Sequence, residues 1–71
     1  MQRQPVASSS LVSVGYDASS AILEIEFSKG PVYRYEGVPE FLFQGLMLAS
    51  SKGQFFRTRI VGRYPCREVD R

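Results

Sequence analysis

The sequence predicts an α+β domain, in which a three-stranded antiparallel β-meander is followed by two helices that pack on it. Three observations favour this fold. The 71 residues are 44% apolar, which is enough for one hydrophobic core and no more. Apolar and polar side chains alternate over 21–28, as in a strand with one buried face. After residue 38, apolar residues recur at helical spacing.

The composition excludes most catalytic and metal-binding chemistry. The chain has no His, no Trp and a single cysteine, Cys66. An internal disulfide, a zinc site of thiolate or imidazole ligands and a His-based catalytic dyad therefore have no residues to form them. We expect a non-enzymatic protein without cofactor, metal or small-molecule substrate. The sequence lacks a signal-peptide pattern and an apolar run of about 20 residues, so we expect a cytoplasmic protein without membrane contact.

The expected strands all lie in the first half of the chain. The chain divides into a polar leader expected to be disordered, the domain itself and a frayed tail, over 1–9, 10–64 and 65–71 respectively. Strands are expected over 10–16, 21–28 and 31–36. The first of these is rich in β-branched and aromatic residues and ends at turn residues, which is typical of a strand that enters a hairpin.

The loop between the second and third strands sets their register. A three-residue loop over 28–30 keeps aliphatic and aromatic residues on one face, whereas a two-residue loop would bring Arg34 into the core. Gly30 then stands where the loop needs a positive φ. The expected cross-strand pairs are Leu23 with Tyr35, Glu24 with Arg34 and Ile25 with Tyr33. The pair of opposite charges is expected on the solvent side.

The first helix is expected to begin at Pro39 and to end near Ala49. Proline is favoured at a first helical position, and the carboxylate of Glu40 faces the positive end of the helix dipole. The side of the helix expected to face the sheet consists of Leu42, Phe43, Leu46, Met47 and Ala49.

A second, shorter helix is expected after residue 50. Ser51 and Gln54 have the spacing of a capping box, which starts a helix. Phe56 and Ile60 are four residues apart and would form its buried stripe, and Gly62 would stand near its end.

Positive charge collects in this second helix and beyond it. Residues 1–50 carry three cations and five anions, whereas residues 51–71 carry six cations and two anions. Guanidinium groups bind phosphates and an exposed aromatic ring stacks on an unpaired base, so such a surface suits nucleic acid. The alternative is an ordinary solvated helix face. The candidate nucleic-acid-binding residues are Lys52, Phe55, Arg57, Arg59 and Arg63.

Two other groups of residues allow more than one interpretation. Tyr33 and Tyr35 could stack on bases from an open sheet face, or form part of the core if the first helix covers that face. The expected register favours the core. On the first helix, Phe41, Gly45 and Leu48 form an apolar strip opposite the buried side. The second helix, the N-terminal segment or a second copy would cover this strip, so a protein interface or weak homodimer is expected there.

Several short motifs occur in a characteristic order. They are GYD at 15–17, LEIEF at 23–27, Gly30, YRY at 33–35, GVP at 37–39 and ASSKGQFF at 49–56, followed by Ile60 and Tyr64. Over 8–65 the chain resembles the KTSC domain, a small domain at the C-terminus of some lysyl-tRNA synthetases that also occurs as free-standing bacterial proteins. Family members often have a small polar residue where this chain has Arg57, which makes the surface more basic.

The association of this family with a synthetase implies RNA binding, in agreement with the basic second helix. The favoured function is therefore a non-catalytic module whose basic helix contacts phosphates of tRNA or single-stranded RNA. The alternative is a protein-interaction or homo-oligomerisation module without a nucleic-acid role.

Overall fold

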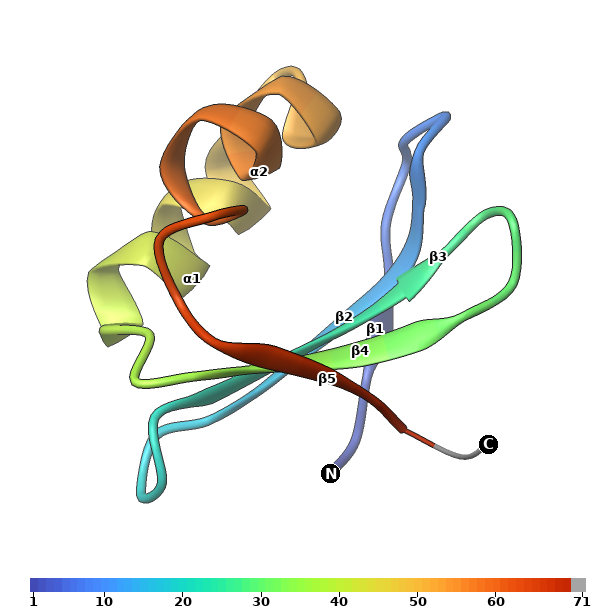
Figure 1. The fold of residues 1–71 in the computed structure, drawn as a ribbon. Helices are drawn as coiled ribbons and strands as arrows, with labels where there is room; N and C mark the ends of the chain where they lie inside the picture. The colour runs from blue at the N-terminus through green and yellow to red at the C-terminus, as the bar shows by residue number, and fades with distance from the viewer. Residues whose placement is uncertain (70–71) are drawn as a thin grey trace.

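The computed structural model describes residues 1–69 as one five-stranded antiparallel sheet with two helices on one of its faces (Figure 1). The elements are β1 (Gln4–Pro5), β2 (Leu11–Asp17), β3 (Ile22–Phe27), β4 (Val32–Glu36), α1 (Glu40–Leu48), α2 (Lys52–Arg59) and β5 (Cys66–Val69). The strands lie side by side in chain order, with β1 and β5 at the two edges. The helices thus connect two neighbouring strands, β4 and β5.

The core lies between the sheet and the two helices. Its buried residues are Leu11, Val14, Leu23, Ile25, Tyr35, Val38, Leu42, Leu46, Phe56 and Ile60. Phe56 of α2 and Ile60, the residue directly after α2, are both buried, as expected. Between residues 1 and 69, neither helix is long and apolar enough to cross a membrane.

The predicted register of the central hairpin is confirmed. Residues 28–30 form the loop, and Gly30 has a φ of +125°. The observed pairs include Leu23 with Tyr35, Glu24 with Arg34 and Ile25 with Tyr33. This register puts the tyrosines on the face that the helices cover, because side chains alternate between the two faces of a strand.

Tyr16 ties β2 to the start of α1. Its ring stacks on Phe43, with 5.0 Å between the ring centroids, and its hydroxyl donates a hydrogen bond of 2.6 Å to the carbonyl oxygen of Val38. Burial, followed by the charges of Glu40 and Asp17, raises the pKa of Tyr16. The phenol therefore remains a hydrogen-bond donor at neutral pH.

The prediction of three strands is wrong in number, because two edge strands lie in segments expected to be disordered or frayed. β1 pairs with β2, and the Val6 amide donates to Val12 just beyond it. β5 pairs with β4, and the Glu36 amide donates to Pro65. Main-chain hydrogen bonds hold β1 and β5 in the sheet, and an edge strand can pair in this way with few buried apolar residues. Residues 70–71 of the expected tail lie outside the described residues.

α2 begins as predicted and ends earlier than expected. The Ser51 hydroxyl accepts a hydrogen bond of 3.4 Å from the Gln54 amide, which satisfies one free N–H at the helix start. The helix ends at Arg59, and Gly62 follows in a turn with a φ of +79°. Arg63 consequently belongs to this turn and not to the helix.

Gly15 allows the N-terminal segment to cross β2 closely. A Cβ at this position would lie 2.8 Å from the main-chain oxygen of Gln2 and 3.0 Å from Cγ of Arg3. Real Cβ atoms essentially never approach main-chain oxygen that closely. Only glycine therefore lets Arg3 pass over β2 toward β3.

We predict that Gly15→Val displaces β1 from the sheet and lowers the free energy of unfolding by about 1–3 kcal/mol, because the new side chain overlaps the N-terminal segment. Urea denaturation measures the loss, and hydrogen exchange should show reduced protection of the Val6 amide. Ala18→Val, at an exposed turn residue, is the control and should change stability by less than about 0.5 kcal/mol. Equal stability of the two variants would contradict the close crossing.

Candidate nucleic-acid interface

The cations of α2 have no acidic partners within residues 1–69. Ion pairs in this part of the chain join Arg3 to Glu24 and Glu26, and Arg34 to Glu24. All of these groups lie on the sheet face away from the helices, as the alternation along β3 and β4 requires. Within the described residues, no carboxylate therefore neutralises the positive charge of α2.

The candidate cations do not form one continuous row. Arg57 lies on the side of α2 that faces residues 7–10, whereas the guanidinium of Arg59 lies over the Phe55 ring, 5.7 Å from its centroid. Arg63 is exposed in the turn after the helix. Lys52 is half-buried, and its Nζ donates a hydrogen bond of 3.0 Å to the carbonyl oxygen of Ala49. The positive charge after residue 50 is therefore spread over more than one side of α2.

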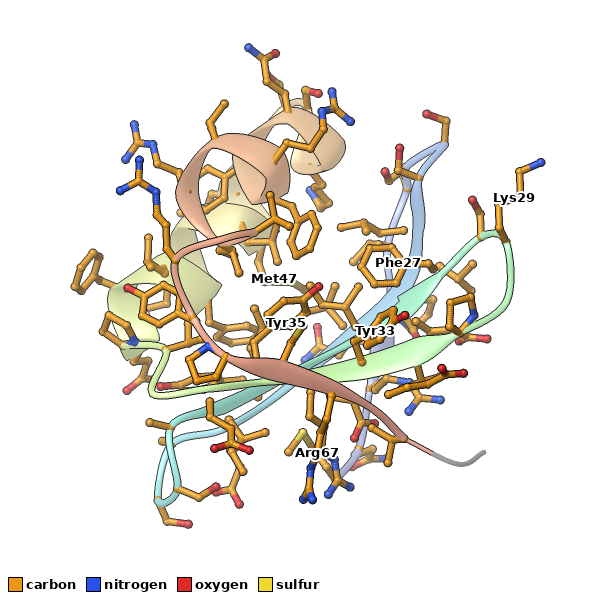
Figure 2. All side chains as sticks on the ribbon, in the orientation of Figure 1. Phe27, Lys29, Tyr33, Tyr35, Met47 and Arg67 are labelled. Carbon is orange, nitrogen blue, oxygen red and sulfur yellow. The ribbon has the colours of Figure 1, made fainter. Side chains whose placement is uncertain are left out.

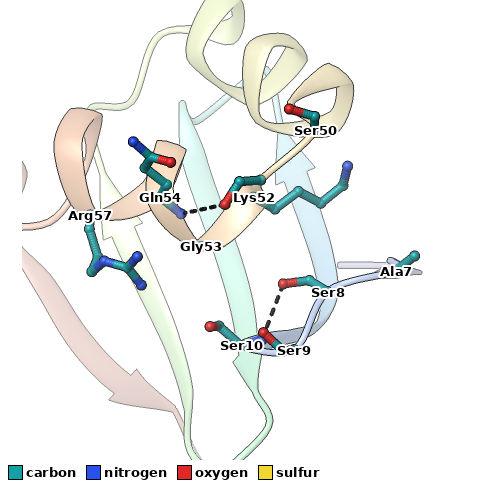
Figure 3. Close-up of a pocket in the computed structure, with 10 residues that line it drawn as sticks. Ala7, Ser8, Ser9, Ser10, Ser50, Lys52, Gly53, Gln54 and Arg57 are labelled. Atoms are coloured by element: carbon teal, nitrogen blue, oxygen red, sulfur yellow. Dashed lines mark hydrogen bonds between the residues drawn. The ribbon is translucent and has the colours of Figure 1, made fainter.

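A polar cavity of about 310 Å³, here called the serine cavity, lies between the start of α2 and the segment before β2 (Figure 3). It is lined by Ala7, Ser8, Ser9, Ser10, Ser50, Ser51, Lys52, Gly53, Gln54 and Arg57. Two of these residues are cationic and none is acidic. The cavity therefore favours an anion with several acceptor oxygens.

Gly53 brings the two walls of the serine cavity together. A Cβ on Gly53 would lie 3.0 Å from Ser10 Oγ and 3.4 Å from a terminal nitrogen of Arg57. The guanidinium of Arg57 therefore lies close to the start of α2. Figure 3 shows Lys52 and Arg57 extending on either side of Gly53.

A second cavity, here called the aromatic cavity, lies beside the 28–30 loop and measures about 500 Å³. It is lined by Ser9, Ser10, Phe27, Ser28, Lys29, Pro31, Tyr33 and Tyr35. Tyr35 is 4% exposed and belongs to the core, and burial, followed by the neighbouring Cys66, raises the pKa of its phenol. Tyr33 is only half-buried. The two tyrosines thus have different surroundings.

Phe55 is not the freely displayed ring that a helical wheel suggests. Its ring is half-buried against α1, where a Cβ on Gly45 would lie 2.8 Å from Phe55 Cζ. Phe55 therefore covers the middle of the apolar strip on α1. The two ends of this strip remain open, since Phe41 is 71% exposed and Leu48 is 86% exposed.

Glu24 is buried on the outer face of the sheet, which corrects the expectation of a solvated charge pair. Arg34 donates to one carboxylate oxygen at 2.7 Å, and Arg3 donates to the other. Burial alone would raise the pKa of Glu24, but these hydrogen bonds and the two positive charges lower it below its ordinary value. Arg3 also donates to Ser13, so the N-terminal segment is held at two points.

The sequence and the fold place this chain in a known family of small domains. The model of the KTSC domain family matches residues 7–64, and the chain belongs to that family.

Among its relatives, an uncharacterised protein of Stutzerimonas stutzeri is 52% identical over 56 residues, which are 79% of each chain. A protein of Tsukamurella paurometabola is 38% identical over 61 residues, 86% of this chain and 91% of its own. The crystal structure of a KTSC domain protein from Yersinia pestis is similar with a TM-score of 0.92, at 48% identity and 97% coverage of both chains.

Sequence reasoning missed part of the candidate interface. Phe27 appears in the sequence only as one member of an alternating strand, and 8–10 appear as the end of a polar leader and the start of a strand. Their position beside α2 depends on contacts between residues more than 40 positions apart, such as Ser10 with Gly53. The sequence signal for this contact was the serines that line both walls of the serine cavity, at 8–10 and at 50–51.

We predict that Glu24→Gln lowers the free energy of unfolding at pH 7 by about 1–3 kcal/mol, because two arginines lose their charged partner. The native pKa of Glu24 is lowered from 4.5, so its stabilising effect is present above pH 4.5 and is lost as the pH falls through the native value. Urea denaturation from pH 7 to pH 3 should therefore show a flatter acid dependence in the variant. The exposed Glu36 serves as the control, and Glu36→Gln should change the free energy of unfolding at pH 7 by less than about 0.5 kcal/mol.

Proposed function

We propose that this protein is a non-catalytic RNA-binding module that contacts phosphates through Lys52, Arg57, Arg59 and Arg63. The observation that carries the proposal is the division of charge between the two sides of the molecule. The acids of β3 are paired with Arg3 and Arg34 on the outer sheet face, whereas the cations of α2 have no acidic partner among residues 1–69. Unpaired cations on one side release counterions when they bind phosphates.

The divided arrangement of the cations supports contact with more than one phosphate. Arg57 and Lys52 line the serine cavity, and Arg59 lies on the opposite side of Gln54. A strand that passes the start of α2 could thus meet positive charge on both sides. This contact would fix the position of the strand without reading its sequence, because phosphates are the same at every nucleotide.

We predict that Arg57→Gln and Arg59→Gln each weaken binding to a labelled single-stranded RNA. Each should reduce the slope of log K against log salt concentration by about 0.7, the value for one lost phosphate contact. Fluorescence anisotropy over a range of salt concentrations measures both effects. Folding of each variant is verified by circular dichroism.

Arg67→Gln is the matched control for this experiment. Arg67 lies opposite Arg34 on the outer sheet face and points away from the helices (Figure 2). The change in net charge is the same, but the affinity and the salt slope should stay close to wild type. An equal loss in all three variants would show that only overall charge matters, and would contradict an interface on α2.

A second candidate function is self-association through the ends of the α1 strip. Phe41 and Leu48 are the most exposed large apolar residues among those that the structure describes. They are seven residues apart and therefore lie on the same side of α1. A second copy of this chain, in contact at these two side chains, would remove both from water.

We predict that sedimentation velocity at increasing protein concentration detects a weak dimer, and that Phe41→Ser and Leu48→Ser each shift it toward monomer. Both side chains are exposed, so neither change should lower the free energy of unfolding by more than about 0.5 kcal/mol. Gln44→Ser, at an exposed polar position of the same helix, is the control. A strict monomer at high concentration would exclude this function.

A further inference from the structure

The serine cavity and the aromatic cavity adjoin each other. Ser9 and Ser10 line both of them. Ser10 packs beside Gly53 of α2, and its carbonyl oxygen accepts a hydrogen bond of 3.0 Å from the amide of Ser28, next to β3. Ser9 and Ser10 therefore form a common rim between a cationic compartment and an aromatic one, and the two compartments with this rim are here called the cleft.

The cationic compartment is equipped to donate hydrogen bonds. Lys52 uses one of its three ammonium protons on Ala49, which leaves two for a ligand. The hydroxyl oxygens of Ser8 and Ser51 already accept bonds from main-chain amides, so their own protons remain available. With the guanidinium of Arg57, these groups match the oxygens of a phosphate.

The aromatic compartment offers a wall of fixed rings. Phe27 and Tyr33 meet edge to face, with 5.8 Å between centroids, and both are half-buried. Phe56 holds Phe27 from the core side, and Tyr35 lies beside Tyr33. Figure 2 shows Phe27 and Tyr33 on the face of the sheet that carries the helices. A rigid aromatic surface beside an open space is suited to stacking by a base.

We infer that this cleft holds one unpaired nucleotide of a nucleic-acid strand, with its base against Phe27 and Tyr33 and its phosphate between Lys52 and Arg57. The inference rests on the proposed function and names the part of the strand that is recognised. Compartments of about 310 and 500 Å³ are in the range of small-ligand sites. A base within a duplex is already stacked and paired, so the cleft selects single strands.

The test measures binding of labelled hexauridylate, hexadeoxyuridylate and an RNA duplex to the full chain by fluorescence anisotropy. Tyr33→Leu should weaken binding of the single strands by at least about fivefold, because it removes a stacking surface. Binding of the duplex should be unchanged. A preference for the ribose or the deoxyribose strand identifies the sugar that the cleft accepts, and supports the cleft when Tyr33→Leu reduces that binding.

Phe55→Leu is the matched control, because Phe55 is also half-buried but packs against Gly45 on α1. It should change binding of the single strands by less than about twofold. A larger loss in Phe55→Leu than in Tyr33→Leu overturns the cleft and returns the stacking role to α2. The proposed function would still stand if Arg57→Gln reduced the salt slope.

An amide chemical-shift titration of the wild-type chain gives a second measurement that does not depend on the folding of a variant. Hexauridylate should shift the amides of 8–10, 27–30 and 32–33, since Pro31 has no amide proton. Shifts confined to 55–63 would overturn the cleft while supporting RNA binding by α2. An absence of any shift and of any binding would overturn both the cleft and the proposed function.

Discussion

The buried carboxylate of Glu24, held between Arg34 and Arg3, is the interaction on which the position of the N-terminal segment, residues 1–10, depends. β1 has only two residues paired with β2, and one of them, Pro5, has no amide proton to donate. Arg3 adds an anchor that reaches across Gly15 to the third strand. Because the chain continues from β1 directly to Ser8 and Ser10, an ion pair on the outer face helps to place hydroxyl groups beside α2 on the other face.

The sequence was sufficient to predict the central hairpin and the start of α2, because in each case nearby residues alone decided the structure. Gly30 and the burial of one face left a single register, and Ser51 with Gln54 marked a helix start. The edge strands were not predictable in this way. Short strands carry no alternation of their own, and β1 depends on a contact between residues 21 positions apart in the chain.

The site was predicted only in part, for a similar reason. Composition identified the basic character of the region after residue 50, but a helical wheel places side chains around one helix and says nothing of its neighbours. Gly45 leaves space on α1 that the Phe55 ring fills, so this ring is less available than its wheel position suggests. The serines and Phe27 converge through tertiary contacts, which a periodic pattern does not contain.

The outer edge of β5 limits how the sheet can grow. Consider two copies whose β5 strands pair antiparallel with the helices of both copies on the same side of the sheet. Each odd-numbered residue would then lie opposite an odd-numbered residue, and each even-numbered residue opposite an even-numbered one, because opposite side chains share a face. The registers centred on the middle of Cys66–Val69 would then bring Arg67 against Arg67, or Glu68 against Glu68. Like charges directly opposite each other weaken strand pairing. At the other edge, Pro5 of β1 lacks an amide proton and so offers one hydrogen bond fewer to an added strand. Both edges of the sheet therefore resist the edge-to-edge addition of strands that leads to fibrils.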